Sequence, residues 1–118
     1  MIKVNIESKD RKHIDLVKIH GHAMYDDFGK DIVCSSVSSI VTTTVNGIYE
    51  IDNTYLNVEL IKDGMIITIL KIDKVCDKLI KNMNMTIDYL DDDISVDTDE
   101  YNDAVKKSYG DKYGYTEG

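Results

Sequence analysis

The 118-residue chain has no proline, only two cysteines and no long apolar run. Without proline, turns have to be located from glycine, aspartate and polar clusters. The N-terminus alternates apolar and polar residues where a signal peptide would have an apolar block, so we expect a cytoplasmic protein whose two cysteines are reduced thiols. Apolar runs far shorter than the roughly 20 residues of a membrane span predict no membrane partner.

Basic residues are also scarce: the chain has 14 Lys and Arg and 22 Asp and Glu, which gives a net charge of −8. Phosphate binding needs a clustered basic surface, so we expect no direct nucleic-acid partner. A basic protein or peptide is the natural electrostatic partner. The length predicts a single domain over residues 1–100, followed by a flexible, tyrosine-containing tail over 101–118.

The periodicity of apolar residues predicts seven elements. Alternation, or a β-prone apolar run, predicts strands at 2–6, 14–23, 56–60, 65–70 and 94–96. Apolar residues spaced by three and four predict helices at 31–49 and 74–90. The order β-β-α-β-β-α-β indicates an α+β fold of two layers, with two helices packed on a mixed, mainly antiparallel sheet.

The predicted strand 14–23 places Val17 and Ile19 on one face and His20 and His22 on the other. His22 therefore comes at the end of a strand. The segment 24–30 that follows has no periodicity and contains a glycine and two acids, which is typical of a loop.

Each predicted helix has an aspartate at its start. With Asp31 as the N-cap, Cys34 is the third residue of the first helix. Asp73 is the expected N-cap of the second helix, and Cys76 falls on that helix's apolar stripe. We therefore interpret Cys76 as a structural core residue.

The sequence G-H-A at 21–23 is followed by Gly29 and by D-I-V-C-S-S-V-S at 31–38. This spaced pattern resembles the signature of the ribosomal-processing cysteine protease family. The resemblance implies that His22 and Cys34 form a catalytic dyad, with Gly21 shaping the site. Serines at 35, 36 and 39 stand where alanine is common in that family, which affects helix packing rather than the dyad.

The physical chemistry of cysteine agrees with this assignment. The thiolate is the nucleophile, and an ordinary cysteine is mostly protonated at neutral pH. A helix start and a neighbouring imidazolium both favour the thiolate, and Cys34 and His22 fit these roles. Asp31 either only caps the helix or also orients His22. Ser38, one turn after Cys34, either hydrogen-bonds near the site or bonds back to its own helix.

The loop between the dyad residues supplies candidate substrate-binding side chains. Tyr25 and Phe28 could form a lid or pocket wall for an apolar side chain, or pack into the core. Asp26 and Asp27 could attract a basic peptide, or be solvated loop residues. Gly29 completes this set of loop candidates.

A metal site is the main alternative use of these side chains. His20 and His22 lie two apart on one strand, and Cys34 could be a third zinc ligand. No fourth ligand has helpful spacing, so we predict neither a metal nor a cofactor. We interpret His13 and His20 as solvated surface residues.

The resemblance implies a cysteine endopeptidase that removes the N-terminal extension of a large-subunit ribosomal protein precursor and acts as a homodimer. The alternative is a non-catalytic binding module for a basic ribosomal or viral structural protein. A thiol of ordinary pKa at Cys34 would favour that alternative.

Overall fold

The computed structural model describes residues 2–10, 12–21, 31–92 and 94–98. In this part of the chain the elements follow the predicted order β-β-α-β-β-α-β. Their bounds are β1 Lys3–Glu7, β2 Leu16–His20, α1 Asp31–Ile51, β3 Leu56–Ile61, β4 Gly64–Ile69, α2 Lys74–Leu90 and β5 Ser95–Thr98.

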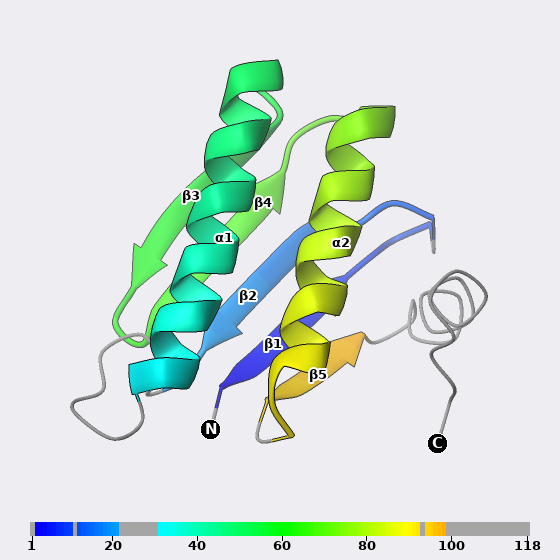
Figure 1. Cartoon of the computed structure of the whole chain (residues 1–118). Helices are drawn as coiled ribbons and strands as arrows, with labels where there is room; N and C mark the ends of the chain where they lie inside the picture. Colours follow the sequence, from blue (N-terminus) through cyan, green and yellow to red (C-terminus); the bar gives the residue numbers. More distant parts are fainter. Residues whose placement is uncertain (1, 11, 22–30, 93, 99–118) are drawn as a thin grey trace.

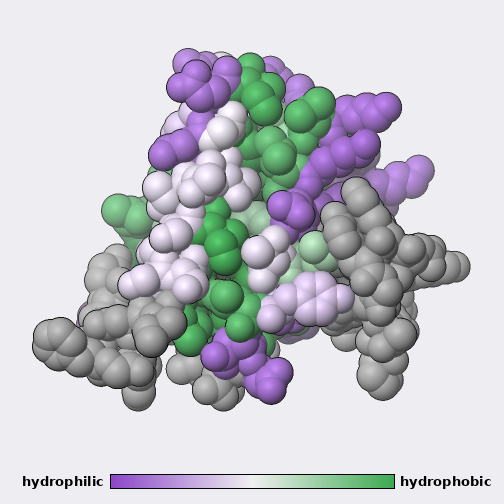
Figure 2. Space-filling model, viewed as in Figure 1, coloured by the Kyte–Doolittle hydropathy of each residue, from purple (hydrophilic) through white to green (hydrophobic). Residues whose placement is uncertain are grey.

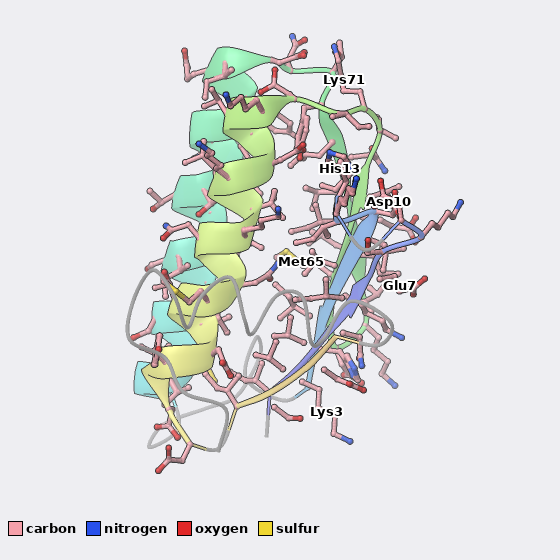
Figure 3. The ribbon with its side chains drawn as sticks, turned by 90° about the vertical axis from the view of Figure 1, so that its right-hand side faces the viewer. Lys3, Glu7, Asp10, His13, Met65 and Lys71 are labelled. Atoms are coloured by element: carbon pink, nitrogen blue, oxygen red, sulfur yellow. The ribbon has the colours of Figure 1, made fainter. Side chains whose placement is uncertain are left out.

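The strands form one mixed sheet in the order β3-β4-β2-β1-β5. All neighbours are antiparallel except β1 and β5, which are parallel. Both helices cover the same face of this sheet and run in opposite directions, so the start of α1 and the end of α2 lie at the same end of the molecule (Figure 1). Figure 3 shows the two layers edge-on. The predicted two-layer α+β fold is thus confirmed.

The core fills the space between the layers. Alternation brings Val4 and Ile6 of β1, and Val17 and Ile19 of β2, to the helix side, where they are buried. The side chain of Met65 on β4 also lies between sheet and helices (Figure 3). The buried apolar side chains of the helices recur every three or four residues: Cys34, Val37, Val41, Val45 and Ile48 on α1, and Cys76, Ile80, Met83 and Ile87 on α2.

Helix α2 begins as predicted. The carboxylate of Asp73 accepts hydrogen bonds from the backbone N–H groups of Val75 and Cys76, at 3.0 and 2.9 Å. This cap satisfies donors that the first turn of a helix leaves unpaired. No helix among the described residues is long and apolar enough to cross a membrane.

A polar cluster ties the β1–β2 connection to α2. Nδ1 of His13 lies 2.7 Å from Oδ2 of Asp10, and its Nε2 lies 3.9 Å from Oδ2 of Asp77. The buried Tyr55 donates its hydroxyl hydrogen bond to the other oxygen of Asp77. Burial and then Asp77 raise the pKa of Tyr55, so the phenol stays protonated and remains a donor.

Candidate active site

The chain leaves the sheet at Gly21. The predicted strand 14–23 is shorter in the structure, because β2 ends at His20 and Gly21 has a φ of 124°. Residues with a Cβ rarely adopt that backbone conformation, whereas glycine does so readily. The N–H of Gly21 donates to the backbone carbonyl of Asp63, 3.0 Å away in the β3–β4 turn. The residue before His22 is therefore held against that turn.

A second glycine makes this approach possible. Gly64 is paired with His20 across β2 and β4. A Cβ on Gly64 would lie 1.9 Å from the carbonyl oxygen of Ile19, well inside van der Waals contact. The end of β2 and the start of β4 can come this close because residue 64 lacks a side chain.

Cys34 lies in the first turns of α1. The helix begins at Asp31, so Cys34 is its fourth residue, one position further into the helix than predicted. The first four N–H groups of a helix have no carbonyl partner within it, and they carry the positive end of the helix dipole. The positive end of the helix dipole therefore favours a negative charge on a side chain in the first turns of α1, where Cys34 lies.

Cys34 is buried beneath the first turns of α1. It is 8% exposed and packs against the apolar core beneath α1. Ser38 lies half-buried one turn later on the same helix. Burial at this position keeps the thiol away from bulk water. The start of α1 and the end of α2 lie at one end of the layers, so Cys34 shares that end with the C-terminus of α2 (Figure 1).

Several predicted site residues fall outside the described residues. These are His22 and the loop candidates Tyr25, Asp26, Asp27, Phe28 and Gly29. The pairing of His22 with Cys34 stays a prediction, as do the roles of the loop and of the Asp31 side chain. Gly21 at the end of β2 contacts the β3–β4 turn, and the start of α1 lies at the same end of the molecule (Figure 1).

His20 does not face Cys34. Register places His20 opposite Lys3 on the face of the sheet that the helices leave uncovered. Its Nε2 lies 2.8 Å from Oδ1 of Asn5. Burial, followed by Lys18 and Lys3, lowers the pKa of His20, so the ring is neutral at neutral pH. A zinc site combining His20 with Cys34 would need ligands on opposite faces of the sheet.

The remaining cysteine and histidine are structural. Cys76 is fully buried, and burial together with Asp73 raises the pKa of its thiol to about 11. This confirms the interpretation of Cys76 as a core residue. His13, expected to be a solvated surface residue, is only partly exposed, and it bonds to Asp10.

Sequence reasoning missed the contribution of the β3–β4 hairpin to this end of the fold. Leu56 and Leu60 fall on the same face of the alternating strand, but Leu56 is buried whereas Leu60 is 72% exposed. The Asp63-Gly64 pair indicates a turn, yet nothing in it shows that the turn contacts Gly21. That contact depends on the strand order, in which β4 lies beside β2.

The comparisons with known proteins agree with this architecture. The profile of the cysteine protease Prp family matches residues 1–105. The structure of the essential ribosomal processing protease Prp from S. aureus, in complex with a covalently linked product peptide, is similar with a TM-score of 0.73 and 20% identity. The similarity covers 83% of this chain and 99% of that one.

Two further crystal structures are similar over 83% of this chain. SMU.848 from Streptococcus mutans has a TM-score of 0.62 and 19% identity over 95% of its own length. A hypothetical protein from Staphylococcus aureus has a TM-score of 0.65 and 13% identity over 99% of its length. No curated protein sequence matches the chain.

Proposed function

The chain belongs to the cysteine protease Prp family, and on that premise we propose that it is a ribosomal-processing endopeptidase with Cys34 as nucleophile and His22 as its activating base. Its substrate is the N-terminal extension of a large-subunit ribosomal protein precursor. The observation that carries this proposal is the position of Cys34 in the first turns of α1, at the end of the fold where β2 leads into His22.

The proposed reaction proceeds by acyl transfer. The Cys34 thiolate attacks the scissile carbonyl carbon and forms a tetrahedral intermediate, whose oxyanion the N–H groups at the start of α1 can stabilise. Protonated His22 gives its proton to the leaving amine nitrogen, and a thioester remains on Cys34. Water, deprotonated by His22, then attacks the thioester carbon and releases the carboxylate product and the thiolate.

A basic substrate is complementary to the net negative charge of the protein and to the acidic residues near the candidate active site. The net charge of −8 attracts cationic peptides in general. Asp63 in the β3–β4 turn and Asp92 after α2 are both exposed acids. Because ribosomal proteins are made in the cytoplasm, a cytoplasmic location of the enzyme is part of the same proposal. A homodimer is part of the same proposal, through the family resemblance.

Peptide cleavage with matched variants tests the dyad. The substrate is a peptide with an apolar, aromatic-containing segment followed by lysines. We expect Cys34→Ala and His22→Gln to abolish cleavage while far-UV circular dichroism stays native. The controls are Cys76→Ala and His20→Gln, because these residues lie in the core and on the uncovered sheet face. Equal activity of Cys34→Ala and Cys76→Ala would exclude Cys34 as the nucleophile.

The pH dependence of alkylation separates a protease from a binding module. In a Cys76→Ala background, iodoacetamide reports on Cys34 alone. An apparent pKa well below 8.5, moving upward in His22→Gln, is the expected result. An apparent pKa near 8.5 in both proteins, together with peptide binding and no turnover, would support the binding module instead.

A further inference from the structure

The end of the fold opposite the candidate active site exposes apolar side chains. Ile51 ends α1, Ile72 lies in the connection between β4 and α2, and Val75 is in the first turn of α2. Each of these residues is more than half exposed. Figure 2 shows apolar side chains gathered at the upper end of the two helices, where α1 ends and α2 begins. Single exposed apolar residues are ordinary, whereas a group of them marks an interaction surface.

Contacts between two connections hold these side chains on one surface, which we call the end patch (Ile51, Ile72 and Val75). Nζ of Lys71 lies 2.7 Å from Oδ2 of Asp52. Because Ile51 precedes Asp52 and Ile72 follows Lys71, this ion pair brings the two isoleucines to the same part of the surface. The chain is described without a gap from residue 31 to residue 92, so both connections are seen in full.

Two charged residues at this end oppose the dipoles of their own helices. Glu50 lies in the last turn of α1, where the helix dipole is negative, and Lys74 begins α2, where the dipole is positive. The last turn of α1 contains no basic residue. Both Glu50 and Lys74 are exposed, and neither has an ion pair among the residues that the structure describes. Each charge would be stabilised beside the other helix end, where the dipole has the opposite sign.

We propose that two copies of the chain associate through the end patch about a two-fold axis, with Glu50 of each copy facing the partner's Lys74. The proposal gives a surface to the homodimer proposed above, and rests on that homodimer. In a two-fold contact each pairing occurs twice. Glu50 then lies near the start of the partner's α2 and Lys74 near the end of the partner's α1, so both charges meet a helix end of favourable sign. The apolar side chains drive association, and the charges select its orientation.

A second copy suits the end patch better than a basic substrate does. A basic partner would meet Lys71 and Lys74 at this end, whereas a second copy offers each charge its opposite. The net charge of −8 opposes association of two copies in general. Physiological salt screens that repulsion beyond about 8 Å, so the charges close to the contact decide, and these have both signs. The two candidate active sites then lie at the far ends of the dimer (Figure 1).

Sedimentation equilibrium over about 1–100 μM protein tests the contact. We expect the native protein to reach twice the 13.4 kDa mass of a single chain. Ile72→Ser should raise the dissociation constant by about 10-fold, because it removes an apolar side chain from the centre of the contact. The matched control is Leu60→Ser, since Leu60 is equally apolar and exposed but lies near the β3–β4 turn, at the other end of the fold. Its dissociation constant should stay within about 2-fold of native.

Charge reversal tests the crossed pairing. Glu50→Lys and Lys74→Glu should both keep native circular dichroism, because each places a favourable charge at its own helix end. Each variant alone should stay monomeric where the native protein is dimeric, since both crossed pairs become like-charged. An equimolar mixture of the two variants should form a dimer. One protein then carries two positive charges at these positions and the other carries two negative charges.

Three outcomes would overturn the proposal. A native protein that keeps the mass of one chain over the whole concentration range would refute the homodimer and the end patch together. A dimer that Ile72→Ser and both charge reversals leave unchanged would refute the end patch alone. A mixture of the two charge variants that stays monomeric would refute the crossed pairing. None of these measurements uses peptide cleavage, so the proteolytic function is tested separately.

Discussion

Asn84 is a buried polar residue in the core-facing part of α2. Asn84 is 2% exposed, and among the residues that the structure describes neither its Nδ2 nor its Oδ1 has a hydrogen-bond partner. Burying an amide without partners costs about 1–3 kcal/mol by protein mutational data. Leucine has nearly the same shape and no polar atoms. We therefore expect Asn84→Leu to stabilise the fold.

The size of the effect follows from two terms. Relief of the desolvation cost contributes about 1–3 kcal/mol, and the better helix propensity of leucine adds a few tenths of a kcal/mol. Asn82 is an exposed asparagine on the same helix, so Asn82→Leu isolates the propensity term. Urea unfolding of both variants should show a larger free energy of unfolding for Asn84→Leu, by at least about 1 kcal/mol over Asn82→Leu.

The opposite result would refute the reasoning. If Asn84→Leu lowers the free energy of unfolding while Asn82→Leu does not, then the amide of Asn84 has partners in solution, such as a buried water bonded to both atoms. Thermal unfolding gives an independent check, because roughly 3–6 °C of Tm per kcal/mol is expected for a domain of this size. Equal shifts in the two variants would show that burial of the amide costs nothing here.

Three further predictions concern stability and pH. Tyr55→Phe should lower the free energy of unfolding by about 1–3 kcal/mol, because Asp77 loses a donor that burial protects; urea unfolding measures this, and an unchanged value would contradict it. Gly64→Ala should prevent native folding or strongly reduce the apparent Tm, because the added Cβ would overlap the carbonyl oxygen of Ile19. A native Tm in this variant would show that β2 and β4 separate easily. The folded state lowers the pKa of Asp73, so the stabilisation by this cap is fully present above the ordinary carboxyl pKa and is lost as the pH falls through the lowered value. The difference in free energy of unfolding between the native protein and Asp73→Ala should therefore shrink in acid. A difference that does not change with pH would contradict this.

Periodicity was sufficient for most of the fold. Alternation located β1 and β3, a β-prone apolar run located β4, and the spacing of Val37, Val41 and Ile48 located α1 despite its β-branched residues. Burial against the sheet compensates for their weak helix propensity. The strand order could not be predicted, because pairing of β1 with both β2 and β5 depends on contacts between distant segments. The exposure of Leu60 has the same origin, since alternation assigns a face but not an edge position.

The position of Cys34 in the candidate site could be predicted from the spacing of residues along the sequence. Cys34 at a helix start follows from Asp31 and the apolar period, although the helix begins one residue earlier than its predicted cap implies. The contact of Gly21 with Asp63 was not predictable, because it joins the end of one strand to a turn more than forty residues away in sequence.

The alternation of side chains between the two faces of the sheet ends along β2 at Gly21. In a continuous strand, His22 would point to the same side as His20, away from the helices and from Cys34. The positive φ of Gly21 ends that alternation directly after His20, so the direction of the next side chain is no longer set by the strand. A residue with a Cβ would be strained there, and the hydrogen bond to Asp63 would be lost if the chain relaxed to an extended conformation. In the proposed protease, Gly21 is therefore a positioning residue: Gly21→Ala should reduce kcat more than it raises KM, while the apparent pKa of Cys34 moves towards its ordinary value. Native kcat in that variant would show that the chain reaches its catalytic geometry without the break in β2.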